Sequence, residues 1–553
     1  MREQIASFLE RRERLVVAAI VALAAVLRGL HVWSAAGSDP FFYMPAVDPE
    51  VYHRWASRIA GGDWIGDEVF FLSPLYPYFL SAIYALFGPD LLAARIVQAV
   101  LGSLSCALLY LVARRAFGRP TAALAGLLAA VYSMSIFYDT VLLVTAIQTP
   151  LNLLCVLLLL RAERLRSPWP WLASGLLLGL STLARPNVLL LGGFVVPWMF
   201  FSLRNRLSWR GIALRAALFG LGAALMVLPV TVRNWAVGDD FVLVSSQGGV
   251  NLYIGNGPGA TGSFRVPSEF PTTRADDPLQ QRESYRAIAQ RDLGRELKPS
   301  EVSGYWTNRT LEQIAEHPGE WTCLLARKLL MLLNHYEAGN SRDYYSSRRF
   351  SAVLGLPLVG FGLIAPLALL GMAVGLRRFR IAAPLYGMVL VYALSLVAFF
   401  VLAHYRMPVV PFLIAFAAFG VCWLLDQIER RRIVPVLVGA AGLAAAAWVV
   451  HLDLYDEESS RYMVEYNLAN RFRRMGRREE AIEAYRRSIE LNPGYISSHH
   501  NLALYCEEPP RDVDCAIRHW KAVLELARAR RDRHYFERAR SHLERLTQSR
   551  NQL

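Results

Sequence analysis

Long apolar stretches recur through the first 451 residues, and short polar clusters separate them. Most stretches reach the roughly 17 or more residues that a helix needs to cross a bilayer. This pattern predicts an all-α polytopic membrane protein with about eleven transmembrane helices. The predicted spans are 15–35, 91–113, 121–137, 141–160, 169–184, 187–203, 212–232, 352–376, 382–402, 408–426 and 433–451.

One further apolar stretch, residues 71–88, is not counted as a span. Counting it would place later arginine clusters on the opposite side of the membrane from the earlier ones. Pro74 and Pro77 are typical of the start of a helix. We therefore predict an amphipathic or re-entrant helix at the outer surface.

Arginines cluster in loops that fall on a single side of the predicted membrane, such as 11–14, 114–119 and 430–432. The positive-inside rule then places the N-terminus in the cytoplasm. Three outer regions follow from this topology, namely 36–90, 233–350 and the tail beyond 452. The clusters account for the net charge of +14, so no nucleic-acid partner is predicted.

The tail, residues 452–553, is predicted to be an extracytoplasmic helical repeat domain, separate from the membrane domain of residues 1–451. Within residues 462–495, small, aromatic and proline positions follow the 34-residue spacing of a tetratricopeptide repeat. An imperfect second unit and a charged capping helix, 532–547, follow. An ordinary helical hairpin is the alternative. Two repeats bury little core, so the tail is expected to lean on the large outer loop or on a protein partner.

The six cysteines form neither a disulfide framework nor a zinc-binding CxxC pattern. Cys506 and Cys515 flank the turn of the second repeat unit. In an oxidising compartment they could form a disulfide, and a pair of buried free thiols is the alternative.

Two acidic residues on the outer side are candidates for catalysis. Asp48 lies at the start of a predicted helix that contains Tyr52, so it either caps the helix or acts as a base. Asp139 lies in a tight turn between two spans, where a carboxylate at membrane depth is costly; it is either functional or a turn residue facing water. Together they could hold a divalent metal ion, although the sequence fixes no cofactor.

Four basic residues occur at the outer ends of spans and are candidates for binding phosphate. They are Arg185, Arg233, His404 and Arg406. The planar fork of an arginine suits bidentate phosphate binding, whereas a single arginine at a helix end can simply extend to the interface.

The glycine-rich segment 245–262 contains a GxGxxG pattern that includes Pro258 and is not surrounded by a βαβ unit, so it does not indicate a nucleotide fold. It is read as a polar loop over the site. Asn251 and Asn256, with Tyr52 from the first loop, are the candidate sugar-contacting residues.

These residues, taken in order, resemble the polytopic C-type glycosyltransferases of the dolichyl-phosphate-mannose–protein mannosyltransferase superfamily, which includes the aminoarabinose transferases of lipid A. The resemblance covers residues 10–451 and rests on the first-loop acid, on SPLYPYFL, AARIVQAVLG, LARPN and HYRMPVVPF, and on Asp139. The repeat resembles that of a bacterial subgroup. Where relatives carry a His or Lys before Pro-Pro-Leu, this chain has Leu72, Ser73 and Pro74.

The resemblance implies inverting transfer of a sugar from a polyprenyl-phosphate carrier to a protein, lipid or glycan acceptor at the outer face of a bacterial inner membrane. It assigns the role of base to Asp48. A transporter or flippase of lipid-linked sugars, and a degenerate scaffold that presents the repeat, are the alternatives.

Overall fold

The computed structural model describes residues 2–265, 267, 278–340, 342–455, 457–530 and 532–552. The described chain is helical, and its one β-bridge, between Tyr132 and Val359, is isolated. The chain divides into two compact units: the first contains residues 1–39 and 45–454, and the second contains residues 40–44 and 455–553.

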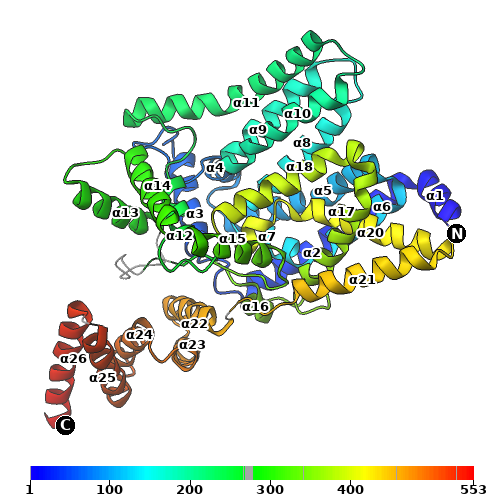
Figure 1. Ribbon diagram of the computed structural model, residues 1–553. Helices are drawn as coiled ribbons and strands as arrows, with labels where there is room; N and C mark the ends of the chain where they lie inside the picture. The colour runs from blue at the N-terminus through cyan, green and yellow to red at the C-terminus, as the bar shows by residue number, and fades with distance from the viewer. Residues whose placement is uncertain are drawn as a thin grey trace. The chain divides into compact units, whose positions relative to one another are not determined.

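The first unit is a bundle of mostly apolar helices with two further helical segments, which are called the first and second outer segments after the predicted topology (Figure 1). The bundle helices are α1 (Arg2–Arg11), α2 (Glu13–Ser38), α5 (Leu91–Phe117), α6 (Arg119–Ala130), α7 (Ser133–Tyr138), α8 (Thr145–Ala162), α9 (Trp169–Ala184), η1 (Pro186–Leu190), α10 (Leu191–Leu203), α11 (Trp209–Gly238), α17 (Phe361–Gly375), η4 (Leu376–Arg378), α18 (Phe379–Ala398), α19 (Ala403–Arg406), α20 (Val410–Glu429) and α21 (Ile433–Val450).

Eight helical segments of the described chain are long and apolar enough to cross a membrane. They are Glu13–Ser38, Leu91–Phe117, Thr145–Ala162, Pro186–Leu203, Trp209–Gly238, Phe361–Ala398, Val410–Glu429 and Ile433–Val450. The segment 361–398 contains both α17 and α18 and so covers two predicted spans. The polytopic all-α fold is therefore confirmed, whereas the count of eleven spans is not.

The two remaining predicted spans coincide with shorter helices. The span at 121–137 is divided into α6, of 12 residues, and α7, of 6 residues. The helix breaks because Ser133 N donates to Val359 O at 3.0 Å and Val359 N donates to Val131 O at 3.2 Å. The other, α9, has 16 residues and ends just before Pro186, which cannot continue a helix.

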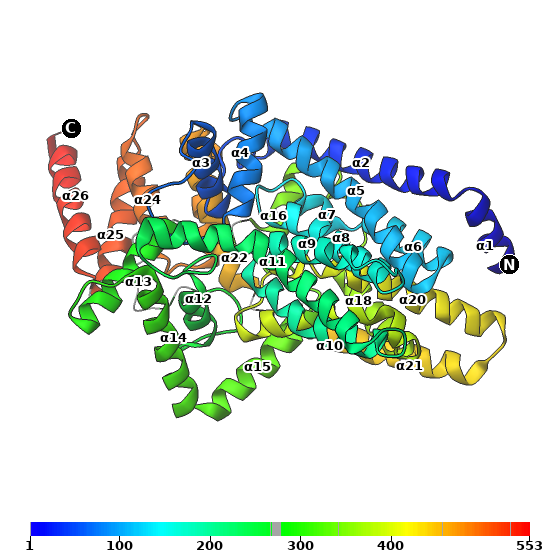
Figure 2. The same cartoon turned by 90° about the horizontal axis from the view of Figure 1, so that it is seen from above.

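The first outer segment holds α3 (Asp48–Ala60) and α4 (Leu75–Phe87), which pack against each other (Figure 2). With 13 residues, α4 is too short to span a bilayer core, which agrees with the prediction for 71–88. The second outer segment holds α12 (Gly248–Asn256), α13 (Pro278–Leu293), α14 (Pro299–Glu316), α15 (Pro318–Leu333), α16 (Tyr344–Ser347) and η3 (Arg348–Phe350).

The C-terminal unit is a stack of helical hairpins with a small apolar core. Its helices are α22 (Glu457–Arg474), α23 (Arg478–Leu491), α24 (Ile496–Glu507), α25 (Val513–Arg530) and α26 (Arg533–Gln552). Residues at the predicted repeat positions, including Ala469, Tyr485, Leu502, Ala516 and Trp520, are fully or almost fully buried. Gly476, in the turn between α22 and α23, has a φ of +73°, which favours glycine at this point.

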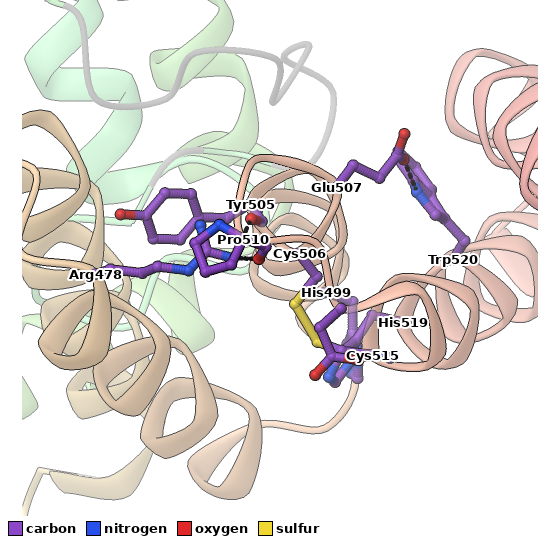
Figure 3. The surroundings of a disulfide bond; sticks show 10 residues. Arg478, His499, Tyr505, Cys506, Glu507, Pro510, Cys515, His519 and Trp520 are labelled. Carbon is purple, nitrogen blue, oxygen red and sulfur yellow. Dashed lines mark hydrogen bonds between the residues drawn. A yellow bond between two sulfur atoms is a disulfide. The ribbon is translucent and has the colours of Figure 1, made fainter.

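Cys506 and Cys515 form a disulfide between the end of α24 and the start of α25 (Figure 3). Their Cα atoms lie 6.0 Å apart. The structure thus selects the disulfide over the alternative of two free thiols. The bond closes the turn that joins these two helices.

The C-terminal unit is expected to lose stability in acid because its histidines are buried. Burial lowers the pKa of His500 and of His519 to about 4. Below about pH 6.5 the unfolded chain binds protons that the folded unit excludes, so stability falls as the pH drops from about 6.5 to about 4 and is unaffected above that window. Hydrogen exchange of peptides from α24 and α25, corrected for intrinsic rates, would measure this loss in the full-length protein.

His500→Phe is the matching control for this pH dependence. The ring of His500 packs edge-on against Trp520 with centroids 5.3 Å apart, and phenylalanine keeps such a contact without titrating. The variant should show a shallower loss of protection below pH 6.5. An unchanged loss would show that His500 does not contribute to it.

Candidate active site

Asp48 is the first residue of α3, and a strained residue precedes it. Val47 occupies the N-cap position with φ 57° and ψ −132° and makes no side-chain capping hydrogen bond. A positive φ is unfavourable for a β-branched residue, and strain of this kind costs about 1–3 kcal/mol. Asp48 is thus not the N-cap residue itself. The non-helical conformation of Val47 marks the start of α3, so the carboxylate of Asp48 extends from the first residue of the helix.

Tyr52 lies one helical turn after Asp48 on the same face of α3. The ring packs edge-on against Tyr76 of α4 with centroids 5.1 Å apart. Burial is the main cause that raises the pKa of Tyr52, and the negative charge of Asp48 adds to it. The hydroxyl is therefore a neutral hydrogen-bonding group beside the carboxylate.

Arg185 is brought to Asp48 and Tyr52 by the end of α9. It precedes Pro186, which excludes the helical conformation, and so takes an extended conformation with φ −148° and ψ 117°. The positive charge of Arg185 lowers the pKa of both Tyr52 and Tyr405, and the negative charge of Asp48 raises the pKa of both. A carboxylate and a guanidinium that are 137 positions apart in the sequence therefore belong to one site.

Tyr405 of α19 completes this group. The Cζ atom of Arg185 lies 4.1 Å from the centroid of its ring, which is a close cation–π contact. Burial raises the pKa of Tyr405 to about 12, against the opposing effect of Arg185. Its neighbour His404 is buried, and burial together with Arg185 holds the pKa of His404 well below its ordinary value. His404 is therefore a neutral group and supplies no positive charge.

Asp139 is held by an arginine of another helix. Nε of Arg28, on α2, donates to Oδ2 of Asp139 at 2.7 Å, and the two side chains are 1% and 13% exposed. Gly102 makes room for this pair, because an added Cβ there would lie 2.0 Å from Oδ2 of Asp139. A cavity of about 20 Å³ beside the pair could hold a water molecule. The carboxylate of Asp139 is thus neutralised within the fold.

The acidic residues do not fit a divalent metal ion well. Among the described residues, no group of three or more His, Cys, Asp or Glu side chains is placed to hold one. Asp139 already carries the counter-charge of Arg28, and Asp48 shares the surroundings of Tyr405 with the positive charge of Arg185. Because a metal site needs several unneutralised oxygen ligands, no step is assigned to a metal here.

Arg406 is adjacent to the site in sequence, but its donors are engaged elsewhere. Nη2 donates to Oε2 of Glu337 at 2.6 Å, and Nη1 donates to the carbonyl oxygens of Leu332 and Asn334 at 2.9 and 2.8 Å. Its Cζ lies 3.6 Å from the ring centroid of Phe361. These contacts are those of a buried ion pair, which joins the loop after α15 to α19.

Arg233 is likewise engaged, here with the first outer segment. Nε donates to Ile65 O at 2.8 Å and Nη1 donates to Glu68 O at 2.6 Å, while Cζ lies 3.8 Å from the ring centroid of Phe70. The arginine at the end of α11 therefore fixes the loop between α3 and α4. Its donors bind backbone oxygens rather than face the group around Asp48.

Asn256 joins the second outer segment to the bundle. Its amide nitrogen donates to Leu252 O and Ala398 O, each at 2.9 Å, and its oxygen accepts from Trp321 at 3.1 Å and from Lys328 at 2.8 Å. Burial lowers the pKa of Lys328 to about 7. The predicted sugar contact is thus a structural junction, whereas Asn251 is half-buried on α12.

The sequence did not single out Tyr405, Gln148 or Tyr392, although all three lie near Arg185 or pack around it. Tyr405 lies between His404 and Arg406 in the sequence. The prediction selected those two residues because they are of basic types, and it passed over the tyrosine between them. Gln148 belongs to a polar stripe on α8 (Thr145, Gln148 and Asn152) that could have been recognised from its helical spacing inside an apolar run.

Comparisons with known proteins bear on the two predicted resemblances. The sequence profile of dolichyl-phosphate-mannose-protein mannosyltransferases matches residues 72–232, a stretch that contains Asp139 and Arg185. The profile of the tetratricopeptide repeat matches residues 464–495. Comparison with curated protein sequences gave no match.

Solved structures with a similar arrangement of helices include two enzymes. The Archaeoglobus fulgidus oligosaccharyltransferase tethered with an acceptor peptide has a TM-score of 0.46 at 13% identity, over 86% of this chain and 59% of that chain. The same enzyme, AglB, in complex with an inhibitory peptide and a dolichol-phosphate has a TM-score of 0.43 at 12% identity, over 83% and 58%. ArnT from Cupriavidus metallidurans bound to undecaprenyl phosphate has a TM-score of 0.33 at 17% identity, over 75% and 79%.

This chain therefore spans less than six tenths of the length of the archaeal enzyme, as the coverage of 59% shows. The profile match is also shorter than the resemblance predicted over residues 10–451, because it begins after Asp48 and ends before His404. Within those bounds the prediction is confirmed: the chain resembles the dolichyl-phosphate-mannose–protein mannosyltransferase superfamily and carries a tetratricopeptide repeat.

Proposed function

We propose that this protein is a glycosyltransferase that moves a sugar from a polyprenyl-phosphate carrier to an acceptor at the outer membrane face, with inversion at the anomeric carbon. The observation that carries this proposal is that Asp48 and Arg185 belong to one site, because both charges act on the same two buried tyrosines, Tyr52 and Tyr405. The profile match to mannosyltransferases supports the same reaction class. The ArnT structure holds undecaprenyl phosphate, a carrier of this chemical class.

The chemistry needs a base and a cation, and the site offers one of each. The acceptor O–H gives its proton to the carboxylate of Asp48 while its oxygen attacks the anomeric carbon. The bond between that carbon and the phosphate oxygen breaks on the opposite face. The carrier leaves as a phosphate monoester with one more negative charge, which the guanidinium of Arg185 stabilises. Asp48, Tyr52, Arg185 and Tyr405 serve the transfer itself and do not distinguish a protein acceptor from a lipid or a glycan.

Arg185 is the phosphate ligand in this proposal. Arg406 and Arg233 are not assigned to the phosphate because other contacts engage their donors, and Asp139 is given no catalytic role in this proposal because it pairs with Arg28. Neutral His404 and half-buried Asn251 remain candidate hydrogen-bonding groups for the donor or the acceptor.

The proposed location is a bacterial inner membrane with the N-terminus in the cytoplasm and the repeat unit outside, where it binds a protein partner. The Cys506–Cys515 disulfide supports the outer placement, because structural disulfides persist in oxidising compartments.

Arg185→Gln tests the proposal on purified full-length protein. With radiolabelled polyprenyl-phosphate mannose, glucose and N-acetylglucosamine as donors, the parent should release the carrier phosphate from at least one of them. The variant should release it about 100- to 1000-fold more slowly, because one preorganised stabiliser of the developing charge is lost. Arg204→Gln, in the loop after α10, is the matched control and should match the parent.

Two outcomes contradict the proposal. Equal rates for Arg185→Gln and the parent would remove Arg185 from the reaction. In proteoliposomes, movement of lipid-linked sugar across the bilayer without release of free carrier would favour a transporter or flippase instead.

A further inference from the structure

Buried polar atoms without a hydrogen-bond partner occur on three side chains of this region: Gln148, Tyr392 and, at Nε alone, Arg185. Gln148 is 0% exposed, and neither its oxygen nor its nitrogen has a partner among the described residues. The same holds for the hydroxyl of Tyr392 and for Nε of Arg185. A buried polar group without a partner is costly and rare in a folded protein, so such a cluster calls for a functional explanation.

The packing of α8 against α9 places Gln148 at the level of Arg185. The two helices are antiparallel, since Cys155 contacts Ser174 O at 3.6 Å while Oγ of Ser181 donates to Oδ1 of Asn152 at 2.7 Å. One turn back along α8 from Asn152 is Gln148. One turn onward along α9 from Ser181 is Arg185, so the two side chains occupy the same layer.

Helix α18 brings the third group to this layer. Asn187, just after Arg185, donates to Oγ of Ser395 at 2.8 Å, and that hydroxyl donates to the backbone oxygen of Tyr392 at 2.7 Å. The phenol of Tyr392 lies beside Asn187 and Gln148 and within the electrostatic influence of Arg185, but in a geometry that leaves its hydroxyl without a well-formed hydrogen bond. Helices α8, α9 and α18 thus bring three side chains with unpartnered buried polar atoms to one layer of the bundle.

These groups are chemically complementary. Nε of Arg185 can only donate, the oxygen of Gln148 can accept, and the amide nitrogen of Gln148 can donate to the hydroxyl of Tyr392. We propose that Gln148 is a positioning residue for Arg185: it accepts from Nε when the outer guanidinium nitrogens bind the phosphate, and Tyr392 orients the Gln148 amide in turn.

This inference rests on the proposed function, because it assumes that Arg185 binds a phosphate. A guanidinium held at Nε presents its two outer nitrogens in the fixed plane that a bidentate phosphate contact needs. The guanidinium also stacks on Tyr405, with Cζ 4.1 Å from the centroid of the ring.

Gln148→Met tests the proposal, because methionine keeps the shape of glutamine but cannot donate a hydrogen bond and accepts one only weakly. Binding of undecaprenyl phosphate to the full-length protein in nanodiscs is expected to weaken about tenfold, equal to about 1.4 kcal/mol. The melting temperature without ligand should stay equal or rise, because the variant removes two unsatisfied buried atoms. Tyr392→Phe should weaken binding in the same direction by a smaller factor.

Asn152→Leu is the matched control on the same stripe of α8. It breaks the hydrogen bond to Ser181, so it should lower the melting temperature and leave undecaprenyl phosphate binding as in the parent. A lower melting temperature for Gln148→Met would make Gln148 a structural residue like Asn152 and would overturn the proposal. Unchanged binding by Gln148→Met would overturn it as well.

The double variant separates a positioning role from direct contact with the ligand. In an Arg185→Gln background, Gln148→Met should cause no further loss of binding, because Gln148 acts only through Arg185. A further tenfold loss would mean that Gln148 contacts the ligand itself, and the positioning role would be rejected. Failure of the parent protein to bind undecaprenyl phosphate would reject the proposed function and, with it, this inference.

Discussion

Asp48→Asn is expected to lower sugar transfer by roughly 100- to 10,000-fold, which is the usual contribution of a positioned base. Asparagine keeps the size of the side chain and its ability to accept a hydrogen bond, so the loss isolates the missing proton acceptor. The effect should appear in kcat rather than in KM, because the donor is held by Arg185 and not by Asp48. Steady-state transfer from the polyprenyl-phosphate sugar that the parent accepts would measure both constants.

Glu50→Gln is the control that matches this change. Glu50 lies in the same first turn of α3, so both variants remove one negative charge near the N-terminus of the helix, a change worth about 0.3–1 kcal/mol of stability. Only Asp48 acts on Tyr52 and Tyr405, so only its loss should stop the reaction. Folded Asp48→Asn protein that transfers sugar at the parent rate would show that the carboxylate serves the helix and not the chemistry.

The spans were predictable because a bilayer imposes one length and one polarity on every crossing helix. Where a predicted span is interrupted in the structure, the interruption depends on residues far away in the sequence. The break between α6 and α7 is created by Val359, which lies more than 200 positions further along the chain and bonds to Val131 and Ser133. A hydropathy pattern describes only neighbouring residues, so it merged the two helices into one span.

The site was partly predictable for a similar reason. Asp48, Tyr52 and Arg185 each stand out locally, as a first-turn acid, its neighbour on the same face and an arginine before proline. The partners that neutralise Asp139 and Arg406 do not stand out, because Arg28 lies inside an apolar helix and Glu337 inside a loop. Isolated charges at membrane depth were therefore read as functional, whereas the structure pairs each with a counter-charge.

Breaking the ion pair between Arg406 and Glu337 is expected to destabilise the protein by about 3–5 kcal/mol, because the remaining charge would be buried without its partner. The side chains are 3% and 5% exposed. Glu337→Gln leaves the guanidinium with the carbonyl oxygens of Leu332 and Asn334 but without its counter-charge. Unfolding in mixed detergent micelles, followed by helicity, would compare this variant with the parent.

The double variant Glu337→Leu, Arg406→Met decides between the structural role and phosphate binding. Replacing both charges by apolar groups leaves no unpaired charge, so its stability should lie above that of either single variant and near the parent. If Arg406 instead bound the carrier phosphate, undecaprenyl phosphate binding would fall by a similar factor in Arg406→Met and in the double variant. Stability recovered in the double variant, with binding retained, would leave Arg185 as the cation of the site.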